Sequence, residues 1–217
     1  VNLSLSSPYF KKTSQPATGA SVYIEDENGK IYQFTEENSG NYIPIDTIPY
    51  DTKNSYTINI EYRNQTFTGE ESLRTVSSID RIEQESVELF GNESVQLEAY
   101  CFDPIEETNY SYFEFTSTEL DFPEYNIFRD DFSSGGEYYG FLLDSGLKKG
   151  DQVKVRQFGL SNFGYNYWYL LILQNTQQGG PFVGKPVNLK GNIVNLKNSN
   201  ENAFGYFRMS EVSEMVY

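Results

Sequence analysis

The stretch ASVYIEDENGKIYQF, residues 20–34, decides the fold class of this chain. Every second residue of 20–24 is aliphatic, which is the two-residue period of a β-strand that buries one face. Asn28-Gly29 follows, and it predicts a tight hairpin turn because both central positions of such a turn favour Asn or Gly. Residues 31–34 then return as a second strand. The stretch therefore predicts an antiparallel β-hairpin.

Short alternating segments separated by turn residues continue on both sides of this hairpin. Further strands are expected at residues 1–5, 42–45, 56–62 and 65–73. No helical period interrupts them. This pattern is typical of packed antiparallel sheets, so residues 1–75 are predicted as an Ig-like or transthyretin-like β-sandwich.

The rest of the chain divides into a connector and a second module. Residues 76–86 are polar and charged apart from a valine and two isoleucines, and they are predicted as the connector. The second module is predicted over residues 87–217, with strands at 95–102, 110–116, 137–143, 152–158, 191–196 and 204–208. The predicted fold class is therefore mainly all-β: an N-terminal sandwich followed by a second β-sandwich-like module with one packed α-helix.

That helix is predicted at about residues 162–177. Ser161 or Asn162 can cap its N-terminus, and apolar residues follow from Phe163 at helical spacing. Gly179-Gly180 then ends it. The apolar stripe is wide, so the helix is expected to pack against a sheet.

Composition restricts the chemistry that the chain can perform. It contains no histidine but has 18 tyrosines and 16 phenylalanines. Without imidazole, Ser-His-Asp and Cys-His relays cannot form, nor can the commonest zinc and non-haem iron sites. The lone Cys101 lies in an apolar run and is interpreted as a core residue. Glycoside cleavage by paired carboxylates stays open, but the sequence singles out no pair among 31 acidic residues. We therefore predict no enzymatic activity, no catalytic residues and no cofactor.

Charge and hydropathy restrict the partners. The formal net charge is -15, and polyanions are bound through Lys and Arg, so nucleic acid is not an expected partner. No stretch approaches the roughly 18 apolar residues of a membrane-spanning helix. No secretory hydrophobic region opens the chain.

Two acidic clusters raise the question of bound calcium. The segment Asp26-Glu27-Asn28-Gly29 offers oxygen ligands, but the hairpin turn explains the same residues and no EF-hand spacing continues beyond it. Asp130-Asp131, with Asp121 and Glu124 nearby, is a richer cluster that we interpret as a solvated acidic loop. We predict no metal at either place, and calcium at the second cluster stays an alternative.

The segment 119–136 is predicted as a loop that is rich in acidic and aromatic residues. Exposed rings beside charges are typical of interface anchors and of platforms that stack on sugars. The candidate contact residues in and just after this loop are Tyr125, Phe128, Phe132, Tyr138 and Tyr139. The alternative is that these rings fold inward and cap the second module.

Several blocks of the sequence, taken in order, resemble a known family. They include Ser7-Pro8-Tyr9-Phe10, residues 16–29, Phe102-Asp103-Pro104, Tyr167-Trp168-Tyr169-Leu170, Gly179-Gly180-Pro181-Phe182, Gly191-Asn192-Ile193 and Gly205-Tyr206-Phe207. In this order they resemble the Bacteroidota outer-membrane lipoprotein family known as domain of unknown function 4249. The resemblance covers nearly the whole chain, and the closing blocks are the most distinctive.

The resemblance implies a lipid-anchored outer-membrane protein that faces the cell surface and accompanies a TonB-dependent β-barrel transporter. Other outer-membrane lipoproteins are further candidate partners. The family has no established catalytic residues to carry over. Its members usually begin with a signal peptide, a lipidated Cys and a further strand, and none of these precedes Val1. We therefore expect either an N-terminus that is trimmed or unseen, or a different mode of anchoring.

The expected function is that of a non-catalytic surface lipoprotein, a ligand-capture or accessory subunit of such a transporter. Two alternatives stay open. One is a carbohydrate-binding or carbohydrate-cleaving module of an outer-membrane glycan system. The other is a structural, adhesin-like sandwich.

Overall fold

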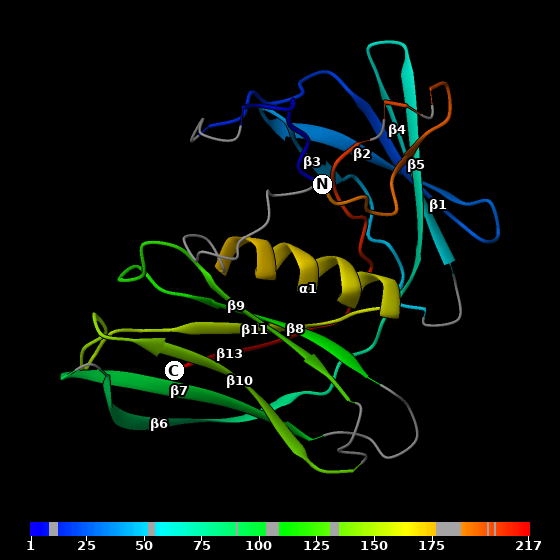
Figure 1. Ribbon diagram of the computed structural model, residues 1–217. Helices are drawn as coiled ribbons and strands as arrows, with labels where there is room; N and C mark the ends of the chain where they lie inside the picture. Colours follow the sequence, from blue (N-terminus) through cyan, green and yellow to red (C-terminus); the bar gives the residue numbers. More distant parts are fainter. Residues whose placement is uncertain are drawn as a thin grey trace. The chain divides into compact units, whose positions relative to one another are not determined.

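The computed structural model describes residues 1–8, 13–51, 55–89, 91–102, 109–130, 135–176, 188–198, 200–201 and 203–217 (Figure 1). These residues form several antiparallel sheets and one helix, so the predicted mainly all-β fold class is confirmed. The backbone forms two compact units. One comprises Val1–Leu73 and Val187–Met209, and the other comprises Arg74–Pro186 and Ser210–Tyr217.

The first unit contains a six-stranded antiparallel sheet. Its order is β12-β5-β4-β1-β2-β3, with β12 at Val194–Asn195, β5 at Gln65–Ser72, β4 at Ser55–Tyr62, β1 at Ser21–Asp26, β2 at Ile31–Asn38 and β3 at Asn41–Pro44. The predicted hairpin forms β1 and β2. Gly29 ends its turn in the left-handed region, at a φ of 79°, which glycine adopts without strain.

The side chain of Asp26 holds this turn. Its Oδ1 accepts the backbone N–H groups of Asn28 and Lys30, each at 3.0 Å, and the hydroxyl of Tyr32 donates to Oδ2 at 3.2 Å. These hydrogen bonds lower the pKa of the Asp26 carboxyl, and the bond from the N–H of Lys30 has the largest effect. The carboxylate that was weighed as a calcium ligand is therefore used within the turn, as the hairpin interpretation expects.

The segment Val187–Met209 returns to the first unit, which differs from the predicted boundaries. Ile193 and Phe207 are buried in the same apolar core as Val22 and Ile58. The strand predicted at 204–208 does not form. Instead the side chain of Asn192 bonds to the backbone of Phe207 in both directions, accepting its N–H and donating to its carbonyl at 2.8 Å each. The side chain of Asn192 thus bonds the backbone of Phe207 where the sequence predicted pairing with another strand.

The second unit contains two antiparallel sheets. The three-stranded sheet has the order β10-β7-β6, with β10 at Glu137–Asp144, β7 at Asn92–Phe102 and β6 at Ile79–Leu89. The four-stranded sheet has the order β13-β11-β8-β9, with β13 at Val212–Val216, β11 at Lys154–Gly159, β8 at Tyr110–Thr116 and β9 at Glu124–Arg129.

Apolar side chains from both sheets share one core. Leu97 and Leu142 enter it from the three-stranded sheet, and Phe113 and Val155 enter it from the four-stranded sheet. The sheets approach so closely that a Cβ at Gly140 would lie 2.4 Å from Cγ of Phe113. The unit is therefore a β-sandwich (Figure 1).

Two segments of this unit differ from the sequence prediction. Most of the predicted connector, residues 76–86, belongs to β6, which pairs with β7 along its length. Part of the predicted loop 119–136 is strand β9. Both are edge strands. The residues of β6 that face away from the core are mostly charged, and β9 has apolar side chains on both faces, Phe128 toward the core and Ile127 toward the helix, so neither strand shows a simple alternation.

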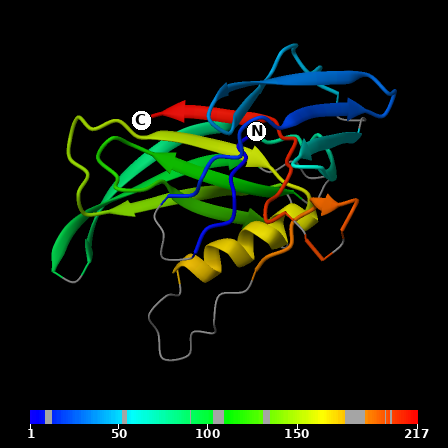
Figure 2. The same cartoon turned by 90° about the horizontal axis from the view of Figure 1, so that it is seen from above.

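Helix α1 spans Asn162–Thr176 and is capped by Ser161, whose Oγ accepts the N–H of Gly164 at 3.1 Å. It packs on the face of the four-stranded sheet opposite the sandwich core (Figure 1 and Figure 2). The rings of Trp168 and Tyr112 meet there with centroids 4.6 Å apart. This confirms the predicted helix and its packing. Within the described part of the chain, no helix combines the length and apolar character needed to cross a membrane.

Candidate functional site

The structure separates the five predicted contact residues. Phe128 lies on β9 and Tyr138 on β10, and their rings stack with centroids 4.0 Å apart beside the sandwich core. Tyr138 is only 4% exposed, so these two rings follow the alternative in which the aromatics fold inward. Phe132 lies outside the described residues.

Tyr125 and Tyr139 are the two whose rings reach solvent, at 36% and 45% exposure. Tyr125 stacks on Tyr112 beside the helix, with centroids 5.5 Å apart and planes inclined by 21°. Tyr139 lies on the other sheet and contacts the ring of Tyr100, with centroids 5.1 Å apart. The predicted residues therefore do not form one patch, but Tyr139 belongs to a larger surface.

This surface is the side of the three-stranded sheet that faces away from the core, and we call it the outer face. Strand register builds it in rows across β10, β7 and β6. The rows are Tyr139, Tyr100 and Arg81; Phe141, Glu98 and Glu83; and Leu143, Gln96 and Glu85, with Glu137 opposite Phe102 at one end. Along the strands, the outer face therefore has an apolar stripe on β10, a polar stripe on β7 and, beside Arg81, an acidic stripe of Glu83 and Glu85 on β6.

The apolar stripe is well exposed. Phe141 is 47% exposed and Leu143 37%, and Phe102 at the end of β7 reaches 59%. The alternation along β10 places these side chains outward while their neighbours fill the core. Large apolar side chains that share one exposed strand face are typical of contact surfaces.

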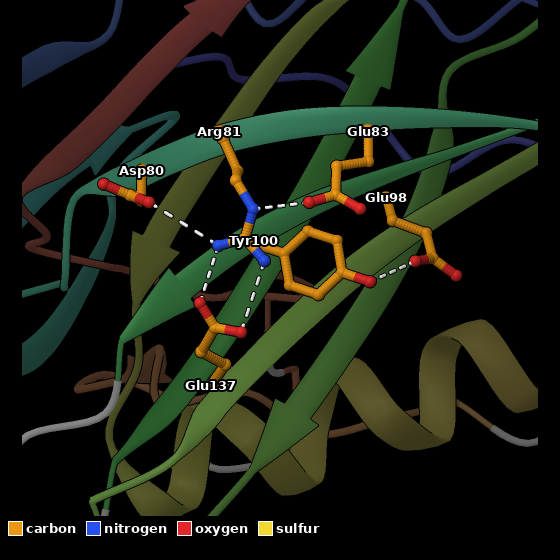
Figure 3. A network of polar contacts seen from close by, with 6 residues as sticks. All are labelled: Asp80, Arg81, Glu83, Glu98, Tyr100 and Glu137. Atoms are coloured by element: carbon orange, nitrogen blue, oxygen red, sulfur yellow. Dashed lines mark hydrogen bonds and ion pairs between the residues drawn. The ribbon is translucent and has the colours of Figure 1, made fainter.

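Arg81 organises one end of the outer face (Figure 3). Its Nη1 and Nη2 donate to the two carboxylate oxygens of Glu137 at 2.6 and 3.2 Å, and its Nε donates to Glu83 at 2.5 Å. Asp80 lies 3.5 Å from Nη1. The guanidinium sits 4.2 Å from the centroid of the Tyr100 ring, which adds a cation–π contact. One arginine thereby joins β6 to β10 across β7.

These contacts fix the protonation of the pair. The bonded carboxylates raise the pKa of Arg81, and Glu137 has the largest effect. The guanidinium in turn lowers the pKa of Glu137. Glu137 is therefore ionised at neutral pH. It lacks the raised pKa that a carboxylic acid needs to donate a proton in glycoside cleavage.

Glu98, in the middle of the outer face, is held by its neighbours on the same strand. The hydroxyl of Tyr100 donates to one of its oxygens, and Gln96 donates to the other at 2.6 Å. The bond to Glu98 raises the pKa of Tyr100 to about 12, so the phenol keeps its proton and acts as a donor. Glu98 lies directly opposite Glu83 of β6 in the strand register.

The acidic cluster considered for calcium is only partly described. Asp121, Glu124 and Asp130 belong to the described residues, and Asp131 lies outside them. Among the described residues, no group of three or more acidic or cysteine side chains is arranged to hold a metal ion.

Sequence reasoning missed most of the outer face. The signal that could have found its apolar stripe is the segment EYYGFLLD at 137–144, where every second residue is Glu, Tyr, Phe and Leu. Its acidic stripe was missed because β6 was taken for a connector. The pairing of Arg81 with Glu137 needs the register of all three strands, which no local pattern contains.

Comparison with known proteins places nearly the whole chain in one family. A search of curated proteins found no match. The sequence model of the family described as "Domain of unknown function (DUF4249)" matches residues 1–215. The chain therefore belongs to the DUF4249 family.

Proposed function

We propose that this protein is a non-catalytic binding subunit of the outer membrane, anchored by an N-terminal lipid and facing the cell surface. It associates with a TonB-dependent β-barrel transporter and contributes to ligand capture or acts as an accessory subunit. Other outer-membrane lipoproteins are further partners in the same proposal. The resemblance of the sequence to outer-membrane lipoproteins supports the location.

The observation that carries the binding role is the apolar stripe of the outer face. Tyr139, Phe141 and Leu143 present large side chains from one strand, at exposures of 45%, 47% and 37%. Exposed side chains of this size favour a protein contact because their burial against a partner removes apolar surface from water. They lie on a paired strand of a packed sandwich, so the surface is rigid before a partner arrives.

The chemistry of the site supports a role without catalysis. A proton relay based on imidazole cannot form in a chain that has no histidine. Three carboxylates of the outer face are engaged as hydrogen-bond acceptors: Glu83 and Glu137 by Arg81, and Glu98 by Tyr100 and Gln96.

The test is purification of the full-length tagged protein from native membranes in mild detergent. We expect recovery in a complex that contains a β-barrel protein, identified by mass spectrometry and by native gel electrophoresis. A tagged lipoprotein of another family is the matched control. Recovery as a free monomer, under conditions in which known transporter complexes survive, contradicts the proposal.

Carbohydrate binding is a second candidate function. It is favoured by the rings of Tyr139 and Phe141, which lie beside carboxylates on a sheet face, an arrangement that suits stacking on sugars. Binding to a glycan array that Tyr139→Ala abolishes and Tyr125→Ala leaves intact would support it. If replacing the exposed rings affects neither complex formation nor glycan binding, the adhesin-like structural role is favoured instead.

A further inference from the structure

The arrangement of charge and apolar surface on the outer face indicates the chemistry of its partner. We propose that the outer face binds a basic amphipathic helix of a partner protein, with its apolar side on β10 and its Lys or Arg side chains over β6. The inference deepens the proposed function and rests on it, because it assigns the surface through which this subunit contacts another protein.

Charge selects a cationic partner. The acidic stripe holds Glu83 and Glu85, and Glu98 lies beside it on β7. Arg81 is the basic residue of the rows that build the outer face, and its guanidinium is engaged by Glu137 and Glu83. The face is therefore acidic, within a chain whose formal net charge is -15. Complementary charge guides association and excludes acidic partners.

The pairing of Glu83 with Glu98 adds to the negative charge of the outer face. Like charges directly opposite on neighbouring strands destabilise a sheet. A neutral or basic residue at either position would remove this repulsion. Proteins keep such local conflicts mainly at functional sites. Arg81 offsets part of this repulsion through its bond to Glu83, and a cationic side chain over Glu83 and the neighbouring Glu85 would offset more of it.

The dimensions of the outer face suit a helix that lies along the strands. Neighbouring strands are about 4.8 Å apart, so three strands span about 10 Å, which is close to the diameter of a helix. Tyr139, Phe141 and Leu143 follow one another at intervals of two residues, or about 7 Å. Helix residues four apart are separated by about 6 Å, so successive turns of an apolar helix stripe can contact successive side chains of β10.

The edge of β10 disfavours an added strand as the occupant. In strand addition, a peptide bonds to the unpaired backbone groups of an edge. The N–H of Phe141, which points away from β7, already donates to the side-chain oxygen of Asn126 on β9. The strand edge of β6 bears Asp80, Glu83, Glu85 and Glu88, and charged residues of this kind protect edges from pairing. Contact through the face is therefore favoured over contact through an edge.

The test places a photo-crosslinking amino acid at position 141 of the full-length, membrane-bound protein. Position 61 on β4 is the control, since Glu61 is also an exposed strand residue. Crosslinked peptides are sequenced. We expect the position 141 adduct to lie in one partner segment with apolar residues at helical spacing and Lys or Arg on one flank. Adducts at 141 on an acidic segment, on polysaccharide or on a non-helical segment would overturn the inference.

A second experiment reverses the charge of one residue on the outer face. Glu85→Lys adds a positive charge to the acidic stripe, and Glu61→Lys makes the same change elsewhere on an exposed strand. We expect Glu85→Lys to lower the crosslink yield at 141 by roughly tenfold and Glu61→Lys to leave it unchanged. Circular dichroism and thermal unfolding verify that both variants fold. Equal yields in the two variants would refute the role of charge.

The two hypotheses fail in different ways. If the barrel is recovered with the protein but position 141 gives no adduct, the inference is wrong and the proposed function stands. If no barrel is recovered with the wild-type protein, the proposed function is wrong.

Discussion

Replacing Gln157 by leucine is expected to lower the free energy of unfolding of the second unit by about 2–4 kcal/mol. Gln157 is fully buried on β11, and its side-chain amide connects the two sheets of the sandwich. Its Nε2 donates to Tyr138 Oη at 2.6 Å and to Ser111 Oγ at 3.0 Å. Its Oε1 accepts from the thiol of Cys101 at 2.9 Å. Leucine fills a similar volume but makes none of these bonds.

The magnitude follows from the groups left behind. A buried hydroxyl without its partner costs about 1–3 kcal/mol, and two hydroxyls lose the amide here. Tyr138 and Ser111 remain 3.4 Å apart and keep a weak mutual bond, and Tyr138 also keeps its bond to Ser77. The total cost is therefore smaller than that of two unpaired hydroxyls. The thiol is a weak donor and adds little. Loss of the packing of Gln157 is offset by the leucine side chain.

Urea unfolding followed by the fluorescence of Trp168, which lies in the same unit, measures the effect. The matched control is the triple variant Gln157→Leu, Tyr138→Phe and Ser111→Ala. Because the amide and the two hydroxyls that it bonds are then removed together, this variant is expected to recover most of the lost stability. The reasoning is refuted if the single variant unfolds at the wild-type urea concentration, or if the triple variant is less stable than the single one.

Three further predictions concern other parts of the molecule. Gly140→Ala is expected to lower the free energy of unfolding by about 1–3 kcal/mol, since the new Cβ would overlap Phe113 and overpack the core; urea unfolding measures it. The lowered pKa of Asp26 stabilises the fold above the ordinary pKa of 3.8, and this stabilisation is lost as pH falls through the folded-state pKa. Asp26→Asn should therefore flatten the decline of stability in acid, as measured by thermal unfolding between about pH 2 and 5. Burial raises the pKa of Cys101 to about 12, so Ellman's reagent should label the thiol only after denaturation, and rapid labelling of the native protein would contradict this.

The sequence predicted those elements whose signals are local. The hairpin at 20–34 has alternation and a turn that demands Asn or Gly, and the helix at Asn162–Thr176 has a cap and an apolar stripe. Strand β6 was missed because its outward residues are charged and its burial depends on β7. The return of Val187–Met209 to the first unit was missed because it depends on contacts such as Ile193 with the core, which are distant in sequence.

In the candidate site, too, local signals could be predicted and contacts between distant residues could not. Tyr139 was selected from the sequence as one of several aromatic residues in and just after an acidic loop, and it is exposed on β10. Tyr138 was selected as well, although its phenol is buried and bonded to Gln157. The sequence alone does not distinguish a buried tyrosine from an exposed one. The bond between Arg81 and Glu137 joins residues 56 positions apart, and only the register of three strands brings them together.

The Arg81 network and the apolar stripe are physically linked. Arg81 is held by Glu83 on β6 and by Glu137 on β10, and its guanidinium covers the Tyr100 ring between them. Tyr100 in turn contacts Tyr139 on the apolar stripe. Ordering a side chain on binding costs about 0.5–1.5 kcal/mol, and a ring already held by its neighbours avoids part of that cost. Loss of Arg81 should therefore weaken binding at the apolar stripe even though the arginine itself lies at the far edge of the sheet.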